Sequence, residues 1–378
     1  MKILFTGGGT GGHFYPLIAV AQEINKIIKE KKIIPPKLYY LSNNSYDKRL
    51  LFENGITFKK ISAGKLRRYF SFLNFFGLFK TAYGLVKSLY LIWKIFPDVV
   101  FSNGGNVAFP VLLSAKIFKI PVFIHISDVI PGRTNRWASK FAQRVSTAFP
   151  ETCEYLSVKK EKVAVLGNPI RRELIIPLEK GAGEFLQMEN DIPVIFVLGG
   201  SSGAQTINEN LIDILPELTE KYQIIHQTGK QLFEDAKRRA FLVLENSKNK
   251  KRYKPFPYLN TLAMRMSAGT SNLIISRAGA NSISEIAVWG RPSLIIPISE
   301  EVSGDQRKNA FAFARAGACV VIEQKNLTPI LFLAEINKLM DDKEKMKTMG
   351  IKAKEFSRQN AANKIADEII NIAIKYAE

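Results

Sequence analysis

Cysteine and histidine are scarce in this chain, and their scarcity limits the sites that it can build. The two cysteines, Cys153 and Cys319, lie far apart, and neither belongs to a C-x-x-C pair. Neither a disulfide framework nor a cysteine-based zinc site is therefore expected. The three histidines, His13, His125 and His226, are scattered and show no spacing typical of metal ligands.

Long apolar runs are also absent. No stretch reaches the length of about 18 uncharged apolar residues that a transmembrane helix needs. The apolar span that begins at Met1 runs straight into glycines and is too short for the core of a signal peptide. We therefore expect the chain to remain in the cytoplasm.

Acidic residues are outnumbered by basic ones. There are 54 Lys and Arg against 34 Asp and Glu, which gives a net charge of +20 at pH 7. Such a surface attracts anions, among them nucleic acid, anionic membranes and phosphorylated small molecules, and charge alone does not choose among them. With 378 residues and 46% hydrophobic residues, the chain is globular and long enough for two or three domains.

Short apolar runs alternate with segments of helical periodicity. The runs are continuous rather than alternating, which predicts strands buried on both faces and hence parallel sheets flanked by helices. The pattern restarts near Pro193, so we expect two Rossmann-like halves. The expected strands are Ile3–Thr6, Leu38–Leu41, Asp98–Ser102, Val122–His125, Val163–Leu166, Pro193–Leu198, Gln223–His226, Asn272–Ser276, Ser293–Pro297 and Cys319–Ile322.

Glycine-rich loops follow the first strand of each half, at residues 7–12 and 199–203, and two further loops of this kind lie at 102–106 and 276–280. Glycines there allow a ligand to approach the backbone and expose N–H groups at a helix start, which suits phosphate. The first loop contains G-x-G-x-x-G, but the acidic residue that holds a dinucleotide ribose is missing, since the nearest carboxylate is Asp47. An oxidoreductase remains an alternative, whereas no P-loop motif is present.

Six strings from one end of the chain almost to the other resemble the MurG family, the N-acetylglucosaminyltransferases of peptidoglycan synthesis. They lie at residues 7–16, 131–135, 167–171, 199–208, 276–292 and 304–310. The resemblance implies the GT-B fold, an α/β architecture of two Rossmann-like, doubly wound parallel-sheet domains that face each other across a cleft. It implies an acceptor domain of residues 1–165 with the C-terminal helix 356–378, and a donor domain of residues 166–355.

The resemblance also implies an inverting transfer of N-acetylglucosamine from UDP-N-acetylglucosamine to lipid I, which forms lipid II. No metal and no other cofactor is implied, and the chain has no D-x-D motif. Helix N-termini and cations are then expected to take the place of a metal at the leaving diphosphate. The implied donor residues are Ser201, Ser202, Gly203 and Arg277 for the diphosphate, Tyr258 and Leu259 for uracil, Glu285 for the ribose, and Asp305, Gln306 and Asn309 for the sugar.

On the acceptor side, the resemblance implies that His13 lies near the nucleophile, and we expect it to be the general base. Ile126 stands where the family commonly has a glutamate, so His13, or Asp128 acting nearby, is expected to carry more of the base chemistry. A neutral imidazole at a helix start beyond a strand is suited to accept a proton from a hydroxyl. The implied acceptor-binding residues are Thr10, Gly11, Gly12, Asn135 and Arg171. The chain departs from the family pattern at Ile126, Asn106 and Ser202. We expect these differences to change contacts with the acceptor and to leave the donor site unaffected.

A basic aromatic segment separates Glu53 from Asp98, and no carboxylate lies between them. Lys80, Lys87 and Lys94 recur every seven residues, and aromatic residues occupy other helical positions. This pattern predicts a helix at the surface of an anionic membrane. Alternatives are that the aromatic stripe is part of the core, or that the segment binds single-stranded nucleic acid.

We therefore expect a peripheral enzyme at the cytoplasmic face of the cell membrane. Its expected partners are UDP-N-acetylglucosamine, lipid I and anionic inner-leaflet lipids, together with proteins of cell-wall synthesis and division, but no nucleic acid. Another lipid glycosyltransferase that uses UDP-sugars, a UDP-sugar epimerase or a non-enzymatic binding protein remain alternatives. The segment Ala361–Ala377 reads as an amphipathic helix that returns to the N-terminal domain.

Overall fold

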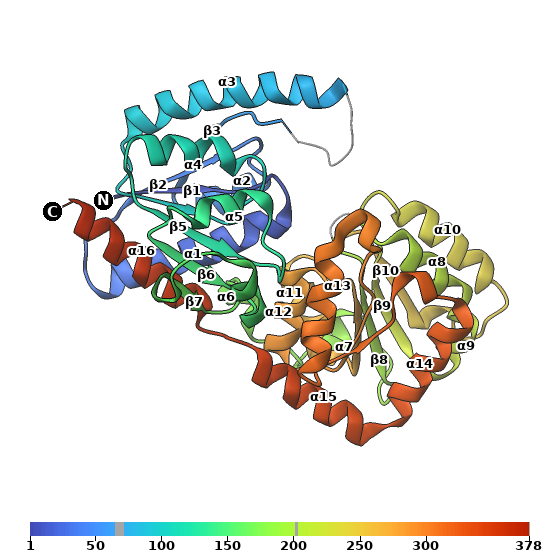
Figure 1. The fold of residues 1–378 in the computed structure, drawn as a ribbon. Helices are drawn as coiled ribbons and strands as arrows, with labels where there is room; N and C mark the ends of the chain where they lie inside the picture. The colour runs from blue at the N-terminus through green and yellow to red at the C-terminus, as the bar shows by residue number, and fades with distance from the viewer. Residues whose placement is uncertain (65–71, 201–202, 378) are drawn as a thin grey trace. The chain divides into compact units, whose positions relative to one another are not determined.

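The computed structural model describes residues 1–64, 72–200 and 203–377, and it divides into two compact units (Figure 1). Unit 1 comprises Met1–Arg171 and Gln359–Glu378, and unit 2 comprises Arg172–Arg358. The expected division, after residue 165 and before residue 356, lies a few residues from these bounds. Within the described ranges, no helix is long and apolar enough to cross a membrane.

Unit 1 contains a seven-stranded parallel sheet with the order β3-β2-β1-β4-β5-β6-β7. Its strands are β1 (Lys2–Thr6), β2 (Lys37–Ser42), β3 (Ile56–Lys60), β4 (Val99–Ser102), β5 (Val122–Ile126), β6 (Arg144–Thr147) and β7 (Val163–Val165). Its α-helices are α1 (Gly11–Glu30), α2 (Lys48–Glu53), α3 (Phe72–Ile95), α4 (Ala108–Ile117), α5 (Arg133–Ser139) and α16 (Ala361–Ala377). Two 3₁₀ turns follow at Pro150–Tyr155 and Lys160–Lys162.

Unit 2 contains a six-stranded parallel sheet with the order β10-β9-β8-β11-β12-β13. Its strands are β8 (Val194–Leu198), β9 (Gln223–Gln227), β10 (Tyr253–Phe256), β11 (Leu273–Ser276), β12 (Ser293–Ile295) and β13 (Val320–Val321). Its α-helices are α6 (Arg172–Ile175), α7 (Ala182–Phe185), α8 (Gln205–Asp213), α9 (Leu215–Lys221), α10 (Phe233–Val243), α11 (Thr261–Thr270), α12 (Ala280–Trp289), α13 (Glu300–Arg315), α14 (Pro329–Asp341) and α15 (Lys343–Phe356). Short 3₁₀ turns lie at Lys250–Arg252 and Gln324–Asn326. Two parallel α/β sheets are the architecture that the continuous apolar runs predict.

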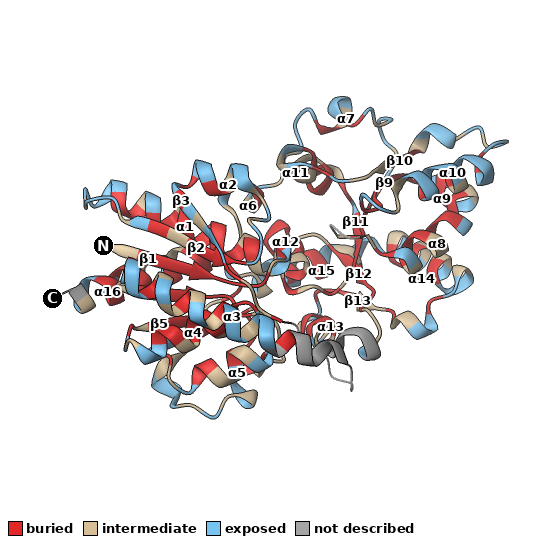
Figure 2. Ribbon diagram, turned by 90° about the horizontal axis from the view of Figure 1, so that it is seen from above, coloured by how far each residue is buried: buried red, intermediate tan, exposed pale blue. Residues whose placement is uncertain are grey.

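Each sheet lies between two layers of helices, so its central strands are buried on both faces (Figure 2). In unit 1, α1 and α16 pack on one face with residues such as Ile24 and Ile369. Helices α3, α4 and α5 cover the other face with residues such as Ile92, Val111 and Ala138. Because all strands are parallel, their carboxyl ends meet at one edge of each sheet, where ligands of doubly wound folds bind.

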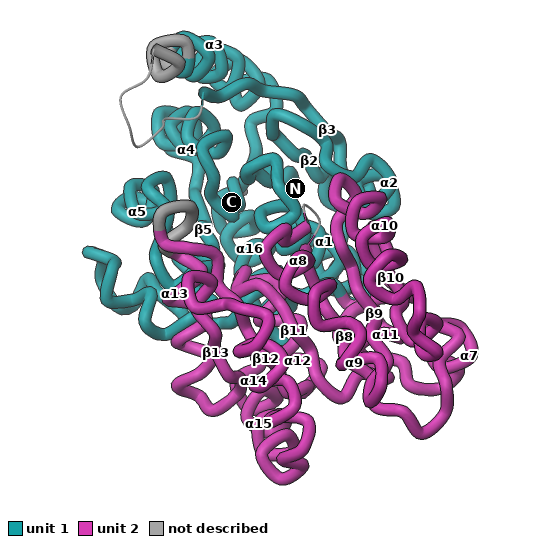
Figure 3. Tube along the Cα trace, turned by 90° about the vertical axis from the view of Figure 1, so that its right-hand side faces the viewer, with its two compact units in different colours: residues 1–171, 359–378 teal, residues 172–358 magenta. Residues whose placement is uncertain are grey.

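Helix α16 follows unit 2 in the sequence but packs against α1, so the C-terminal helix belongs to unit 1 (Figure 3). Its apolar face joins the core that surrounds β1 and β4. Two ion pairs fasten its polar face: Asp367 accepts from Lys31 at 2.9 Å, and Glu368 accepts from Arg144 at 2.8 Å. Such exposed pairs contribute little, so apolar packing holds this helix.

Helix α3 turns its aromatic stripe away from the sheet. Phe79, Tyr83, Val86, Tyr90 and Trp93 are all more than half exposed, at 62%, 62%, 68%, 54% and 64%. The opposite side of the helix is buried and is made of Gly77, Gly84, Ser88, Ile92 and Ile95. The alternative that the aromatic stripe forms core is therefore wrong for these five residues. The side chain of Phe76, which also belongs to the expected stripe, is outside the part that the structure describes.

Candidate functional site

The first glycine loop of unit 1 lies in close contact with the loop that follows β4. The backbone N–H of Gly8 donates to the carbonyl of Gly104 at 3.0 Å. A Cβ on Gly8 would come within 2.5 Å of Cδ2 of His13, and a Cβ on Gly105 would come within 2.7 Å of the Gly8 nitrogen. Gly104 and Gly105 also have positive φ angles of 79° and 86°, which favour glycine. These glycines are needed so that two loops can meet at the carboxyl edge of the sheet.

His13 lies in the first turn of α1, directly beyond β1. Its Nδ1 is 2.8 Å from the backbone carbonyl oxygen of Asn103. A carbonyl oxygen only accepts, so Nδ1 must carry the hydrogen, and in the neutral ring Nε2 then holds the free lone pair. The side chain is partly exposed. The geometry therefore leaves His13 with a proton acceptor at Nε2.

Several other residues expected at the acceptor site lie around this helix start. Thr10 is the N-cap of α1, and its carbonyl accepts from the backbone N–H of His13 at 3.1 Å. Gly11 and Gly12 form the first turn. The guanidinium of Arg171 lies 4.2 Å from the ring centroid of Tyr15 in the same helix, a cation–π contact. The structure therefore gathers these residues at one end of α1.

Asn135 and Asp128 lie beyond β5, the neighbour of β4 in the sheet. Asn135 is 6% exposed, and its Nδ2 donates to the carbonyl of His125 at 3.3 Å. Its Oδ1 is buried without a hydrogen-bond partner and faces the position where a Cβ of Gly104 would lie. The backbone carbonyl of Asp128 accepts from Thr152 at 3.2 Å. Asn135 thus keeps an unused acceptor beside the loop that contacts His13.

The corresponding edge of unit 2 carries the second glycine loop. Gly203 has a φ of 81°, and a Cβ there would come within 2.5 Å of the carbonyl oxygen of Thr228. Helix α8 begins two residues later, so the N–H groups of its first turn lie next to the loop. Ser201 and Ser202, which are expected to contact phosphate, lie outside the described residues.

A buried hydrogen-bond chain, which no sequence motif indicates, fixes the other side of this loop. Asn208 on α8 donates from Nδ2 to the carbonyl of Thr228 at 3.0 Å, and its Oδ1 is 3.0 Å from Nε2 of His226. Nδ1 of His226 is 2.9 Å from the hydroxyl of Tyr253. Burial lowers the pKa of His226 to about 3, so the ring is neutral and links α8 to β9 and β10.

Arg277 follows β11 at the same edge. Its Nη1 donates to the carbonyl of Ile296 at 3.2 Å, and partial burial lowers its pKa to about 10, which leaves it charged at neutral pH. Asn309 on α13 is fully buried, and its amide donates to the carbonyl of Ala278 at 3.2 Å. In this arrangement Asn309 holds the loop that carries Arg277, and the sugar contact implied for it stays a prediction.

The remaining expected donor residues come from three other segments. Tyr258 is 39% exposed and lies below Lys230, whose Nζ is 5.4 Å from the ring centroid. Leu259 is buried, and its backbone N–H donates to Oε1 of Gln227 at 2.9 Å. The structure places Glu285 on α12, and Asp305 and Gln306 on α13. All three are partly buried, and Gln306 accepts from the backbone of Ile298 at 3.3 Å.

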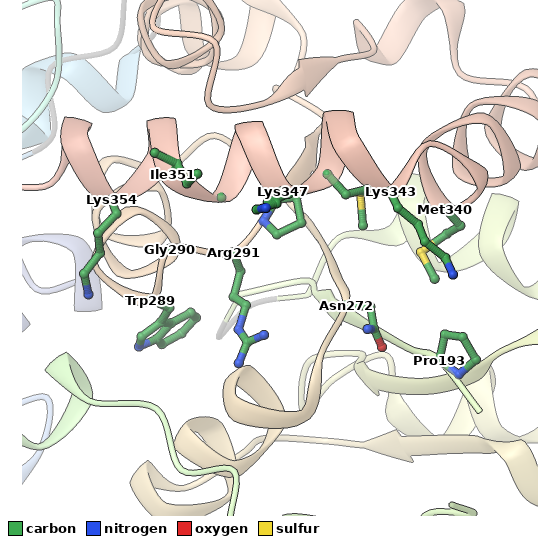
Figure 4. A pocket seen from close by; sticks show the side chains of 13 residues that line it. Pro193, Asn272, Trp289, Gly290, Arg291, Met340, Lys343, Lys347, Ile351 and Lys354 are labelled. Atoms are coloured by element: carbon green, nitrogen blue, oxygen red, sulfur yellow. The ribbon is translucent and has the colours of Figure 1, made fainter. Parts of the chain in front are cut away.

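A cavity of about 630 Å³ lies at the opposite edge of unit 2, where the strands begin (Figure 4). Pro193 and Asn272 directly precede β8 and β11, and Lys343 and Lys347 of α15 face them across the cavity. Arg291 also lines it but is bound to Glu179 at 2.7 Å and to the carbonyl of Gly269 at 2.6 Å. This cavity therefore lies apart from the glycine loops, at the end of the sheet where the strands begin.

Acidic and sulfur side chains do not gather with histidine anywhere in the described ranges. There, no group of three or more His, Cys, Asp or Glu residues is arranged to hold a metal ion. Cys153 is exposed and Cys319 is buried, and both are free.

The chain matches two family descriptions. Residues 3–147 match the glycosyltransferase family 28 N-terminal domain, and residues 194–367 match the C-terminal domain of the same family. The two matches fall on the two sheets. The solved structure of MurG from Acinetobacter baumannii has a TM-score of 0.73 and 26% identity, with 98% of this chain and 99% of that chain covered.

A UDP-GlcNAc 2-epimerase from Neisseria meningitidis, solved with UDP-GlcNAc bound, has a TM-score of 0.70 at 16% identity, over 98% of this chain and all of that one, and shares the fold alone. A curated relative in Clostridium tetani is 36% identical over 99% of this chain and 98% of its own length. That relative is named UDP-N-acetylglucosamine–N-acetylmuramyl-(pentapeptide) pyrophosphoryl-undecaprenol N-acetylglucosamine transferase. The GT-B fold, the two family 28 domains and this identity over nearly the whole chain together place the chain in the MurG family of N-acetylglucosaminyltransferases.

Proposed function

We propose that this enzyme transfers N-acetylglucosamine from UDP-N-acetylglucosamine to the C4 hydroxyl of the N-acetylmuramoyl residue of lipid I, and so forms lipid II. The observation that carries the mechanism is the hydrogen bond from Nδ1 of His13 to the carbonyl of Asn103. Full-length identity to the Clostridium tetani transferase supports the choice of substrates.

His13 acts as the general base. Its Nε2 lone pair accepts the proton of the C4 hydroxyl as the oxygen attacks the anomeric carbon from the side opposite the leaving group, which inverts the configuration. The bond to Asn103 holds the ring in place and stabilises the imidazolium that forms, because the Nδ1 hydrogen stays bound to a carbonyl dipole. Asp128, one residue after Ser127 in the loop beyond β5, contributes negative potential near this proton.

The start of α1 holds the acceptor. The positive end of the α1 dipole attracts the diphosphate of lipid I, and the side chain of Thr10 makes no capping hydrogen bond there. Gly12 is exposed and lets the phosphate oxygens approach the backbone, while Gly11 beside it is buried and leaves room for Tyr46. The cation of Arg171 adds charge to this end of α1, and Asn135 supports the loop after β4 from beneath.

The second glycine loop holds the donor diphosphate. Ser201, Ser202 and Gly203 lead into α8, whose first N–H groups meet the charge that develops as UDP departs. Arg277 adds a cation from the end of β11, and its neighbouring loop is held by Asn309. Main-chain amides and one guanidinium thus do the work that a divalent ion performs in other transferases.

Residues on separate elements of unit 2 bind the nucleoside and the sugar. The carboxylate of Glu285 accepts hydrogen bonds from both ribose hydroxyls, and Tyr258 with the carbonyl of Leu259 borders uracil. Asp305 and Gln306 contact the hydroxyls of N-acetylglucosamine from α13.

Helix α3 brings the enzyme to the membrane that contains lipid I. Its exposed aromatic stripe, Phe79 to Trp93, enters the headgroup region, and Lys80, Lys87 and Lys94 bind anionic lipids of the inner leaflet. The absence of any carboxylate between Glu53 and Asp98 makes this side uniformly attractive to anions. We place the enzyme at the cytoplasmic face of the membrane, where proteins of cell-wall synthesis and division are its further partners.

Transfer to a short-chain lipid I analogue tests this function. Radiolabelled UDP-N-acetylglucosamine should label the lipid, and omission of the lipid should leave the nucleotide sugar intact. A product that forms without any lipid would favour an epimerase. Transfer from UDP-galactose in preference to UDP-N-acetylglucosamine would instead favour a related lipid glycosyltransferase.

A further inference from the structure

Asn103 lies at the carboxyl end of β4 and contacts both His13 at the start of α1 and Ser127 in the loop after β5. It directly follows β4, which pairs with β1 on one side and β5 on the other. The residue is 1% exposed, and its backbone N–H donates to the carbonyl of Thr6 at 3.1 Å. Its backbone carbonyl accepts from Nδ1 of His13 at 2.8 Å.

The side chain of Asn103 joins two further segments. Nδ2 donates to the carbonyls of Gly12 and His13, at 3.3 and 3.2 Å. Oδ1 accepts from the hydroxyl of Ser127 at 2.9 Å. Because carbonyl oxygens only accept, the amide nitrogen must face Gly12 and His13, which fixes the orientation of the amide. Asn103 therefore contacts both the imidazole and the main chain of His13, and Ser127 holds Asn103 from the loop after β5.

We propose that Asn103 is a positioning residue for His13, which holds the imidazole in the form that has hydrogen on Nδ1 and a lone pair on Nε2. Ser127 serves the same purpose one step further away, because it fixes the amide of Asn103. A carbonyl or carboxylate that accepts from one ring nitrogen sets which nitrogen is free to react. The inference rests on the proposed function, in which His13 is the base.

The proposed role of Asn103 depends on the position of the loop after β4 relative to His13. The ring hydrogen bond goes to the backbone carbonyl of Asn103, and the side-chain amide clamps that backbone to the start of α1. Loss of the amide frees the loop after β4 to move relative to His13. A displacement of about 1 Å in a catalytic group lowers turnover about 100-fold.

Two substitutions remove the clamp without touching the ring. Asn103→Ala deletes the amide, and Ser127→Ala deletes only the hydroxyl that orients it. Asn54→Ala is the matched control, because Asn54 is also a buried asparagine of unit 1 whose Nδ2 donates to a backbone carbonyl, that of Leu50 at 2.8 Å. It has no contact with His13 among those that the structure gives for it.

Nitrogen-15 NMR of the histidine rings gives a readout that does not depend on turnover. The chain has only three histidines, and single His→Gln variants at positions 125 and 226 assign the other two signals. The wild-type ring of His13 should show hydrogen on Nδ1. Asn103→Ala should convert part of the population to the form with hydrogen on Nε2, and Ser127→Ala should do so to a smaller extent, while Asn54→Ala leaves the signal unchanged.

Kinetics supply the second readout. Asn103→Ala should lower kcat for the lipid I analogue about 10- to 100-fold at an unchanged KM for UDP-N-acetylglucosamine, and should alter the pH profile of kcat. A wild-type ring signal in both Asn103→Ala and Ser127→Ala overturns the proposal, whatever happens to kcat. If Asn103→Ala does not fold, the signal of Ser127→Ala decides.

The same experiment separates this inference from the proposed function. Full turnover by a His13→Ala variant would remove His13 as the base, and the inference would fall with it as a statement about catalysis. A ring signal that shifts in Asn103→Ala while His13→Ala is inactive supports both.

Discussion

Gly84 of helix α3 lies so close to the backbone carbonyl of Ser62 that no side chain would fit between them. Two helical turns earlier, a Cβ on Gly64 would collide with the backbone of Gly77, and the hydroxyl of Thr81 accepts from the backbone N–H of Gly64 at 3.0 Å. These small residues fix the rotation of the helix. The aromatic residues on the other side must then point outward, and Tyr83, Tyr90 and Trp93 are more than half exposed there.

The first prediction concerns the three lysines of this helix. A triple Lys→Gln variant at positions 80, 87 and 94 should bind anionic vesicles about 100-fold more weakly at low salt, since each lysine contributes about 1 kcal/mol near an anionic leaflet. Sedimentation with vesicles of phosphatidylglycerol and phosphatidylcholine measures the difference. Transfer to a water-soluble acceptor analogue should stay unchanged.

The matched control changes three exposed lysines of unit 2, Lys248, Lys250 and Lys251, to glutamine. It removes the same charge from the chain but should retain vesicle binding. Equal losses in the two variants would mean that net charge, rather than α3, attracts the protein to lipid.

A second prediction concerns Glu285. Glu285→Ala should weaken UDP about 10- to 100-fold in calorimetry, because a hydrogen bond to a charged group contributes about 1.5 to 3 kcal/mol. The sharper measurement compares UDP with 2′-deoxy-UDP. The wild type should prefer UDP, and Glu285→Ala should bind both equally; a preference that survives the substitution would contradict contact between this carboxylate and the ribose.

The two sheets could be predicted from the sequence because their strands are apolar runs buried on both faces. Each of the ten expected strands overlaps an observed one, although Cys319–Ile322 contains only the two-residue strand β13. Strands β3, β6 and β10 were not expected. β3 ends in Lys59-Lys60, β6 has a single apolar residue, and β10 contains Pro255, so none of them forms an apolar run. β3 and β10 are edge strands, where such residues are tolerated.

The site was partly predictable for a different reason. Glycine loops after strands can be recognised from a short stretch of sequence, and His13 follows one of them directly. The contact between Ser127 and Asn103 joins residues 24 apart, and it exists because β4 and β5 are neighbours in the sheet. The chain from Tyr253 through His226 to Asn208 likewise depends on the pairing of β9 with β10. Side-chain bonds of this kind require the strand order, which the sequence pattern does not contain.

A third prediction concerns His13 itself. His13→Ala should lower kcat about 100- to 10,000-fold, the usual contribution of a general base, and leave UDP affinity unchanged. Calorimetry with UDP and a lipid-labelling assay give the two values. His13→Gln is the companion variant, because its side-chain amide can still donate to the carbonyl of Asn103 but offers no basic nitrogen; recovery of turnover in His13→Gln would count against proton transfer by this residue.

A fourth prediction concerns the leaving diphosphate. Transfer should continue in EDTA, because the amides before α8 and the guanidinium of Arg277 stabilise the departing charge. Arg277→Gln should lower kcat about 100-fold, and Arg277→Lys should restore part of the loss, since a lysine supplies charge without the planar fork. Activity that disappears in EDTA and returns only with magnesium or manganese would show that these groups do not suffice.

The last prediction follows from the two buried histidines. Burial lowers the pKa of His125 to about 4 and that of His226 to about 3, from an ordinary value of 6.5. Both rings are therefore neutral in the folded chain, and each bonds an asparagine: Asn168 and Asn208, at 3.0 Å. Below pH 6.5 the unfolded chain binds protons that the folded chain does not, so the free energy of unfolding decreases as the pH falls toward 4 and then 3.

Each histidine makes this free energy fall by at most about 1.4 kcal/mol per pH unit and contributes no slope above pH 7.5. Urea unfolding between pH 8 and pH 5, followed by circular dichroism, measures the slope. His226→Gln can keep a donor to Asn208 but does not titrate. The decrease of the free energy of unfolding per pH unit should therefore be smaller than in the wild type, by up to the contribution of one proton. His13→Gln, which changes a partly exposed ring, is the matched control, and an undiminished slope in His226→Gln would mean that His226 is not held neutral by the fold.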